Sequence, residues 1–414
     1  MSESNTTEPK PGASRRSGRM PWRLLLLLVA MHAIGPTSLT IIVPSVPAMA
    51  VQLASDPGLI QLTISLYLVC LAVAQLFLGS LSDRFGRRPV VLAGIALTAL
   101  TSFAAMVAPS AIALIVARSA QAFGASAGMV IGRAMIRDLY DRDRAAAMIG
   151  WVTMTTVVVP MLAPLLGGIL DTAFGWRAIF AFLGAMSLAV LIWAFFALPE
   201  TRPVRRPDAQ PARLAREAGT LLTNRSFIGY SLSGALGCGA FFAVLGGGSH
   251  LVVSIMGRSS VEFGIWFGVT SFGYMIGNFF AGRYSQRYGV DWMVRWGLII
   301  EVIGTAMTVA VAVLIPDVGP APIFALQVVI QIGNGMLLPN AIAGAVSVRP
   351  QVAGTAAGIV GFTQMAIGAV AAQGMTAIHI GAMSAIPLSV TMLVWAAVAL
   401  AAYYAFVHRT RLAL

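Results

Sequence analysis

The chain has 414 residues, of which 58% are hydrophobic and only 10% charged, and its formal net charge is +12. Ordinary soluble domains contain about 25% charged residues, so this chain has too little polar surface to fold in water as the two or three domains its length suggests. The composition therefore indicates an integral membrane protein.

Residues 1–21 form a polar, basic arm, and the first apolar run follows it. That run is not typical of a signal peptide, because Pro44-Ser45-Val46-Pro47 stands where a small-residue cleavage site would be. A membrane-spanning helix needs about 20 apolar residues, since lipid offers its backbone no hydrogen bonds. In the first half of the chain such runs occur at 22–44, 58–80, 89–108, 110–133, 145–170 and 177–198.

A linker rich in arginine and proline, residues 199–225, separates these six runs from six more. The later runs lie at 226–250, 262–282, 292–315, 321–346, 352–376 and 383–407, and a short tail, 408–414, follows them. We therefore expect an all-α integral membrane protein with twelve transmembrane helices, organised as one six-helix bundle at 22–198 and a second at 226–407.

Basic residues are distributed unevenly among the connections between these spans. Of the 27 lysines and arginines, only Arg177 and Arg258 fall in connections that face outward when the N-terminus is inside, and Arg118 lies within a span. This asymmetry predicts that both termini are cytoplasmic and that the positive charge faces the anionic inner leaflet. No nucleic-acid partner is expected, because no basic folded domain remains to bind one.

Two loops indicate that the halves are related. Residues 79–86 read GSLSDRFG, and residues 282–289, 203 positions later, read GRYSQRYG. Both copies lie between the second and third spans of their half, and such a repeat predicts two pseudo-symmetric bundles with a substrate path between them. The charged loop would latch the bundles together on the cytoplasmic side. The simpler alternative for Asp83 is an ordinary solvated loop charge.

The segment GSLSDRFGRR resembles the signature loop of the major facilitator superfamily, through Gly79, Asp83, Arg84, Gly86, Arg87 and Arg88. The family's fourth-span motif is similar to ARSAQAFGASAG, through Arg118, Gln121 and Gly124, and its antiporter motif to PMLAPLLGGIL, through Pro160, Pro164, Gly167 and Gly168. With FGWRAIF and LPET added, the chain resembles the Bcr/CflA branch of proton-coupled drug exporters. The resemblance implies the major facilitator fold, proton-driven efflux by alternating access and a gating role for the loop.

Two residues depart from the pattern of that branch. Ala163 stands where the antiporter motif has glycine, and Thr40 stands where the first span commonly has an aspartate. Thr40 cannot carry a proton, so we consider His32, which titrates near neutral pH, and Glu301, the one acid well inside a predicted span. We favour His32; a bystander role is its alternative, and a structural pairing or a dimer contact is the alternative for Glu301.

Family analogy places the first, fourth, seventh and tenth spans around a central cavity. The cavity candidates on these spans are Thr37, Thr40, Phe241, Phe242, Gln327, Gln331 and Asn334. Arg118 is a functional candidate as well, because an arginine inside a membrane is costly and stays charged. A mostly apolar pocket with few fixed polar groups suits small amphiphilic ligands of varied structure.

The sequence has no cysteine or histidine cluster for a metal, no phosphate-binding loop and no acid–base pair at a workable spacing, so neither an enzyme nor a cofactor is expected. The leading interpretation is a monomeric, proton-driven exporter of small amphiphilic drugs in the cytoplasmic (inner) membrane of a bacterium. The alternatives are an exporter or facilitator of one metabolite, such as an amino acid or sugar, and a non-transporting membrane sensor or scaffold.

The arginine asymmetry generates a prediction about topology. A reporter enzyme fused after residue 210 should be cytoplasmic, and one inserted beside Asp317 should be outside, because the connection at Asp317 lacks basic residues. Protease accessibility in intact and opened cells measures both positions. Finding the two reporters on the same side would contradict the twelve-span arrangement.

Overall fold

The structure is a computed structural model that describes residues 22–140, 142–201, 218–315, 317–379 and 384–408, and within these residues it contains helices and no strand. The first bundle consists of α1 (Trp22–Thr40) with its extensions η1 (Val43–Ser45) and α2 (Val46–Gln52), α3 (Pro57–Phe85), α4 (Arg87–Met106), α5 (Ala111–Leu139), α6 (Arg142–Phe174) and α7 (Trp176–Ala197). The second consists of α9 (Arg225–Ser249) with η2 (His250–Ile255), α10 (Ser260–Tyr288), α11 (Val290–Leu314), α12 (Pro320–Ser347), α13 (Ala353–His379), preceded by η3 (Pro350–Val352), and α14 (Ile386–Tyr403) with η4 (Tyr404–His408).

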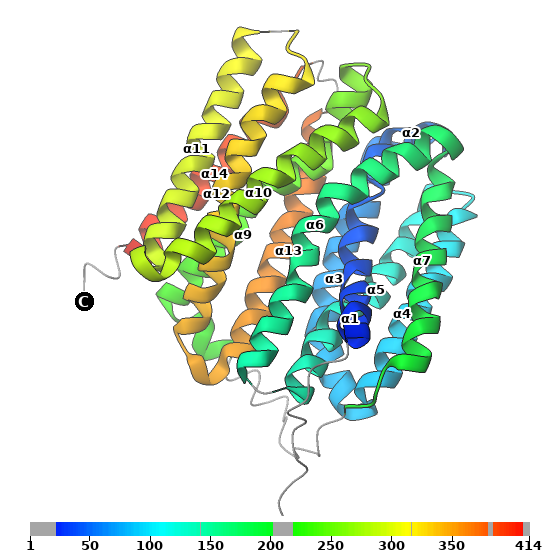
Figure 1. Ribbon diagram of the computed structural model, residues 1–414. Helices are drawn as coiled ribbons and strands as arrows, with labels where there is room; N and C mark the ends of the chain where they lie inside the picture. The colour runs from blue at the N-terminus through cyan, green and yellow to red at the C-terminus, as the bar shows by residue number, and fades with distance from the viewer. Residues whose placement is uncertain (1–21, 141, 202–217, 316, 380–383, 409–414) are drawn as a thin grey trace, which may run out of the picture.

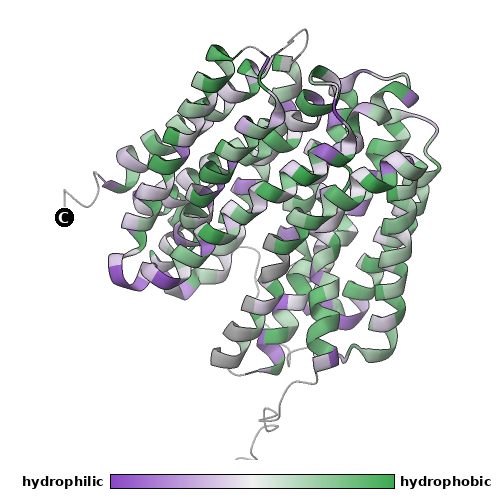
Figure 2. Cartoon of the chain, turned by 45° about the horizontal axis from the view of Figure 1, so that its top comes forward, coloured by the Kyte–Doolittle hydropathy of each residue, from purple (hydrophilic) through white to green (hydrophobic). Residues whose placement is uncertain are grey.

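Among the described residues, eleven helical segments are long and apolar enough to cross a membrane, and they match eleven of the twelve expected spans. Figure 2 shows hydrophobic residues along the lengths of the helices and hydrophilic ones gathered toward their ends. The eighth expected span is present as the 29-residue helix α10 but is less apolar. Polar residues within the helix, among them Thr270, Ser271 and Asn278, lower its mean hydropathy, while its exposed side chains include Ile265, Phe272 and Phe279.

Local sequence signals explain where several helices begin. Asp56 accepts hydrogen bonds from the backbone N–H groups of Gly58 (2.7 Å) and Leu59 (3.3 Å) and so caps α3. Ser110, Asn224 and Ser259 cap α5, α9 and α10 in the same way. Each cap satisfies backbone donors that have no partner within the helix.

The two repeated loops turn at the same kind of glycine. Gly86 has φ +104° between α3 and α4, and Gly289 has φ +86° between α10 and α11. Side chains with a Cβ rarely adopt such angles. The equivalent turns, 203 positions apart, confirm the internal repeat that the sequence predicted.

The helices form two pseudo-symmetric six-helix bundles, as predicted (Figure 1). In the first, α5 packs against α1, α3 and α4, and α7 packs on α4; in the second, α12 packs against α9, α10 and α11, and α14 packs on α9 and α11. The bundles meet mainly through two helix pairs, α6 with α10 and α3 with α13, and η1 also contacts α9 and α10.

Each bundle has a helix crossing at which two backbones touch through glycine. A Cβ on Gly94 or Gly124 would meet the carbonyl oxygen of the other, which ties α4 to α5. Gly297 and Gly333 make the same contact between α11 and α12, and Gly297 lies 203 positions after Gly94. The repeat therefore extends from the loops into the packing of the bundles.

We expect Gly297→Val to destabilise the protein by about 1–3 kcal/mol, the usual cost of overpacking a close contact, because the new side chain would collide with the carbonyl of Gly333 and with Leu337. Thermal unfolding followed by size-exclusion chromatography in detergent measures the effect. Gly358→Val is the matched control, because a Cβ there meets no atom within 4 Å. An unchanged melting temperature for Gly297→Val would contradict this account of the crossing.

Candidate functional site

The helices α6 and α10 approach each other backbone to backbone at one end of the molecule. A Cβ on Gly168 would lie 2.5 Å from the carbonyl oxygen of Ser260, and one on Gly264 or Gly268 would meet carbonyl oxygens of α6. Gly167, beside Gly168, makes a similar contact with the carbonyl of Ile41. Gly168, Gly264 and Gly268 thus form a seam between the bundles, whereas Gly167 packs within the first bundle. Along this seam, Pro160 and Pro164 interrupt the hydrogen bonding of α6.

Polar contacts reinforce this seam. The Ser260 hydroxyl donates to Asp171 Oδ2 (3.0 Å) and also lies 3.3 Å from the carbonyl oxygen of Pro44. On the second helix pair, Ser65 donates to Gln373 Oε1 (2.7 Å), and Gln373 Nε2 donates to the carbonyl of Gly58 (3.0 Å). We call the end that carries these contacts the closed end.

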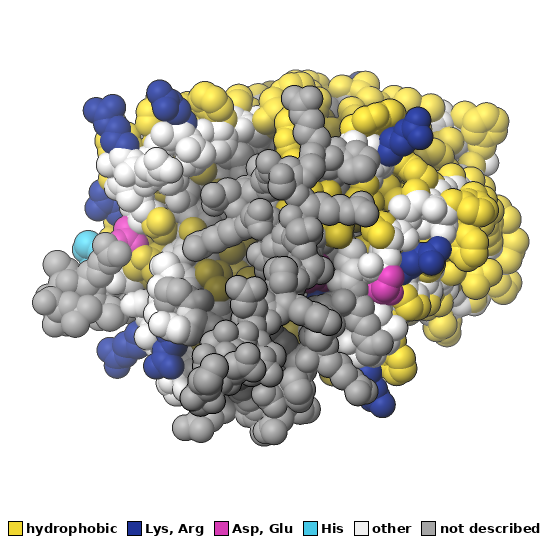
Figure 3. All heavy atoms as spheres, turned by 60° about the horizontal axis from the view of Figure 1, so that its bottom comes forward, with side chains coloured by type: hydrophobic (Ala, Val, Ile, Leu, Met, Phe, Trp, Pro, Cys, Tyr) yellow, Lys and Arg dark blue, Asp and Glu magenta, His cyan; other side chains and the backbone are white. Residues whose placement is uncertain are grey.

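The opposite end carries the loop at 79–88, and we call it the motif end. Along α13 the glycine contacts stop at Gly361, whose Cβ would lie 3.6 Å from Gln75 Oε1. At Gly79, Gly354 and Gly358 an added Cβ would meet no atom within 4 Å. Figure 1 shows α6 and α10 side by side at the closed end and diverging toward the motif end. In Figure 3, which views the motif end, basic side chains ring the face and acidic ones are few.

Arg87 makes most of the polar side-chain contacts of the motif loop. Its guanidinium pairs with Asp83 (2.7 Å) and with Asp138 of α5 (3.0 Å), and it donates to Ser82 Oγ (2.6 Å). The Arg87 side chain is 8% exposed, whereas that of Asp83 is 51% exposed. The loop therefore fastens α3, α4 and α5 of one bundle together, and the partners of the Arg87 guanidinium among the described residues all belong to that bundle.

Glu200, just after α7, completes this arrangement. Its two carboxylate oxygens accept hydrogen bonds from the backbone N–H groups of Arg87 (3.0 Å) and Arg88 (3.2 Å), at the positive N-terminal end of α4. A Cβ on Gly86 would lie 2.8 Å from Glu200 Oε2, so this glycine also leaves room for the cap. Arg88 in turn donates to the carbonyl of Phe195 (2.5 Å).

Arg118 is fully enclosed within the first bundle. Its guanidinium lies 4.2 Å from the ring centroid of Tyr67, donates to the carbonyl of Thr63 (3.3 Å) and hydrogen-bonds Gln121. The Gln121 amide nitrogen donates in turn to Ser102 Oγ of α4 (2.6 Å). The structure therefore brings Arg118 and Gln121 of the fourth-span motif together, while Arg118 Nη2 has no hydrogen-bond partner among the described residues.

The two candidates for proton coupling lie in different bundles. His32 is 1% exposed on α1, and neither ring nitrogen has a hydrogen-bond partner in the described part of the chain. Glu301 is 0% exposed, and glycines of α9 and α12 border its side chain. The alternative of a dimer contact for Glu301 is wrong, because the side chain points into its own bundle and away from the molecular surface.

The cavity candidates occupy several environments. The hydroxyls of Thr37 and Thr40 donate to carbonyls of their own helix, those of Ala33 (2.7 Å) and Pro36 (3.0 Å). Phe241 and Phe242 contact each other edge to face, with Phe241 also against Phe267 of α10 and Phe242 against Gly368 of α13. The amides Gln327, Gln331 and Asn334 form a buried stripe on α12. A direct contact of any of these residues with substrate stays a prediction.

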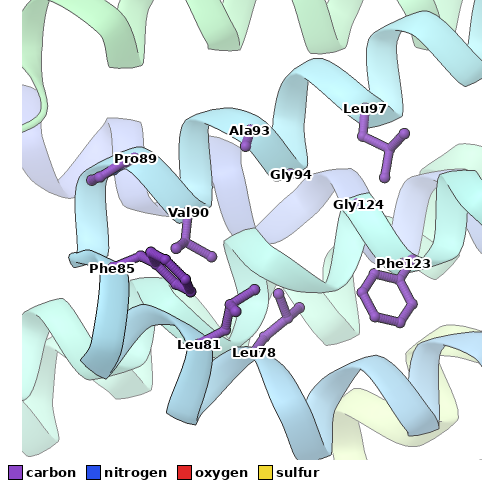
Figure 4. A pocket seen from close by; sticks show the side chains of 10 residues that line it. All are labelled: Leu78, Leu81, Phe85, Pro89, Val90, Ala93, Gly94, Leu97, Phe123 and Gly124. Carbon is purple, nitrogen blue, oxygen red and sulfur yellow. The ribbon is translucent and has the colours of Figure 1, made fainter.

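A separate groove of about 370 Å³ lies on the first bundle, near the motif loop (Figure 4). Side chains of α3, α4 and α5 line it, including Leu81, Phe85, Leu97 and Phe123. The crossing glycines Gly94 and Gly124 also line it, and its lining side chains are apolar. It therefore belongs to the packing of this bundle and not to the predicted central cavity.

The sequence profile that describes the Major Facilitator Superfamily matches residues 28–373.

This chain belongs to the Major Facilitator Superfamily.

Relatives and solved structures agree with that assignment. Multidrug resistance protein D of Escherichia coli K12 is 36% identical over 348 residues, which cover 82% of this chain and 85% of that protein. The bicyclomycin resistance protein homolog of Haemophilus influenzae is 28% identical, covering 93% of this chain and 96% of that protein. A solved bacterial homolog of the human lysosomal transporter Spinster has a TM-score of 0.74 at 18% identity, covering 94% of this chain and 97% of its own, which shows the shared fold. The family and branch that the motifs indicated are confirmed, and the chain is a multi-pass membrane protein.

Sequence reasoning missed four acids and amides that this member of the superfamily uses in its contacts: Asp138, Asp171, Glu200 and Gln373. Three of them had a signal in the sequence, since Asp171 follows the antiporter glycines by three residues, Glu200 belongs to the LPET segment, and Asp138 lies in the segment RDLYDRDRAAA, which also resembles the branch. Gln373 had none, because only the fold brings it to Ser65.

We expect Asp83→Asn to lower substrate flux at least tenfold while protein abundance and melting temperature stay unchanged. The half-exposed ion pair with Arg87 contributes at most about 1 kcal/mol to stability, and Arg87 keeps its more buried partner Asp138. Transport into vesicles at matched protein density measures the effect. Asp317→Asn, an exposed acid outside the motif, is the control. Normal flux in Asp83→Asn would contradict a gating role and show that Asp83 is an ordinary solvated loop charge.

Proposed function

We propose that this member of the Major Facilitator Superfamily exports small amphiphilic drugs from a bacterial cell in exchange for protons. The observation that carries the proposal is the likeness, over most of both chains, to proteins named for multidrug and bicyclomycin resistance. The proposal includes the cytoplasmic membrane as its location, both termini in the cytoplasm, a monomer as the working unit, and no enzymatic activity or cofactor.

The arrangement of the two bundles supports transport by alternating access. The bundles touch at the closed end and are separated at the motif end, so a path between them would open toward the cytoplasm. The seam consists of glycine contacts and a few hydrogen bonds, each of which contributes about 0.5–1.5 kcal/mol. Contacts of this strength stabilise the conformation that is closed at this end, and they are weak enough to break when the protein changes to the conformation that is closed at the motif end.

The motif loop supports a latch for the opposite conformation. Asp83 is half exposed, and its ion pair with Arg87 is weak enough to exchange. When the motif end closes, the Asp83 carboxylate would cap or pair with a helix end of the second bundle, where the positive N-terminus of a helix attracts an anion. Arg87 would stay fixed by Asp138, so the loop keeps its shape while Asp83 changes partner.

The test is uptake by proteoliposomes of purified protein, with ethidium as a cationic compound and bicyclomycin as a neutral one. One proton moving down a one-unit pH step yields about 1.4 kcal/mol, and 100 mV adds about 2.3 kcal/mol. Each 1.4 kcal/mol corresponds to a tenfold ratio, so one proton supports a gradient of roughly 500-fold for a neutral drug. Protein-free vesicles are the control.

The main alternative, transport of one metabolite, rests on Thr40, which replaces the acid that this branch commonly has in the first span. The same vesicles screened with amino acids and sugars distinguish the two. Accumulation of a metabolite but of neither drug, independent of the pH step, would contradict drug–proton exchange.

A further inference from the structure

Glycines of two neighbouring helices border the Glu301 side chain. The side chain leaves α11 at the crossing with α12, where a Cβ on Gly333 would lie 2.9 Å from Glu301 Cγ. On the other side, a Cβ on Gly237 of α9 would lie 3.2 Å from Glu301 Oε2. The carboxyl therefore fills a space that two glycines of neighbouring helices leave free.

Nothing in this space compensates a negative charge. Neither carboxyl oxygen has a hydrogen-bond partner among the described residues, and none of their arginines or histidines forms an ion pair with it. The Asn334 amide on α12 faces the carboxyl, but its nitrogen donates to the carbonyl of Gly237 (3.4 Å). An ionised carboxylate without partners is strongly disfavoured away from water, so this packing suits a neutral, protonated acid.

The internal repeat shows that the fold does not need an acid at this place. Glu301 lies four residues after Gly297, as Thr98 lies four residues after Gly94. The Thr98 hydroxyl is satisfied within its own helix, by the carbonyl of Gly94 (3.0 Å). The first bundle thus builds the same glycine crossing with a small polar residue, and the carboxyl is particular to the second bundle.

Other polar groups near Glu301 are neutral. The thiol of Cys238 on α9 interacts electrostatically with the carboxyl, and Tyr274 of α10 interacts with that thiol. On α12, Asn334 continues a buried stripe formed by Gln331 and Gln327, and both polar atoms of the Gln327 side chain lack a partner among the described residues. This stripe extends for about two turns from Glu301 toward the closed end.

We propose that Glu301 is the proton-binding site of the second bundle and that its proton is released only when α9 or α12 moves away from α11. The inference rests on the proposed drug–proton exchange for its role in transport. Gly237 and Gly333 enclose the carboxyl, so water reaches it only if one of these two helices shifts.

Packing connects such a shift to the seam between the bundles. Behind Glu301, α12 contacts α10 through Gly277 and Gly335, whose backbones touch. Farther along the same helix, Gly264 and Gly268 of α10 contact α6. Continuous backbone contact thus runs from the carboxyl to the closed end, and a change in the spacing of α12 is passed to the interface that opens and closes.

Infrared spectroscopy of the full-length protein in lipid tests the bound proton without reference to transport. Wild type is expected to show the C=O stretching band of a protonated carboxyl that shifts in heavy water. The band should be missing from Glu301→Gln and from Glu301→Thr, which copies the first bundle, and it should remain in His32→Gln and in Glu262→Gln, an acid at the start of α10. A spectrum of Glu301→Gln identical to wild type would overturn the proposal.

Vesicle transport tests the role in coupling. A one-unit pH step is expected to drive about tenfold accumulation of bicyclomycin by wild type. With Glu301→Gln, the drug should only reach equal concentrations on both sides of the vesicle membrane. This variant should melt at the wild-type temperature. Retained pH-driven accumulation in Glu301→Gln, or its loss in His32→Gln alone, would overturn the assignment. If wild type moves neither bicyclomycin nor ethidium, the drug exchange fails, and the infrared comparison still decides whether Glu301 holds a proton.

Discussion

Contact between helix backbones at glycine is the interaction on which the rest of this structure depends. Helices in lipid gain little from burying apolar side chains against one another, since lipid is apolar as well, so close packing and backbone approach hold them together. Inside the bundles, Gly94 with Gly124 and Gly297 with Gly333 provide that approach. Between the bundles, Gly168 and Gly264 provide it again. The same kind of contact therefore serves both the packing inside each bundle and the interface between the bundles.

Charges in the membrane interior are arranged differently in the two bundles. In the first, Arg118 is surrounded by Tyr67, Gln121 and a backbone carbonyl, which together stabilise a cation without a carboxylate. In the second, Glu301 pairs with no cation in the part of the chain that the structure describes, and it fills a gap between glycines. A group that is always charged needs permanent partners, whereas a group that can bind a proton needs none while it is neutral. This difference accounts for the asymmetry in an otherwise repeated architecture.

The motif loop and the closed end have complementary tasks. Arg87, Asp138 and Glu200 keep the loop rigid, while Asp83 is held loosely at its edge. Asp171 and Gln373 hold the opposite end with a few hydrogen bonds. A transporter of this kind needs two closures of similar strength, because a large difference between them would leave one conformation almost unpopulated.

The sequence alone determined the number and position of the spans, the two-bundle repeat and the family. These features depend on local hydropathy, on the fixed spacing of the repeated loops and on motifs within single segments. The tertiary structure decided which side chains meet. Asp138 and Glu200 reach Arg87 from 51 and 113 residues away, and no local pattern records such a pairing. The tertiary structure also decided that Glu301 points inward. Its neighbours on every side of α11 are apolar, so the sequence of α11 does not show which side faces the bundle. The glycines of α9 and α12, on other segments, determine where the carboxyl fits.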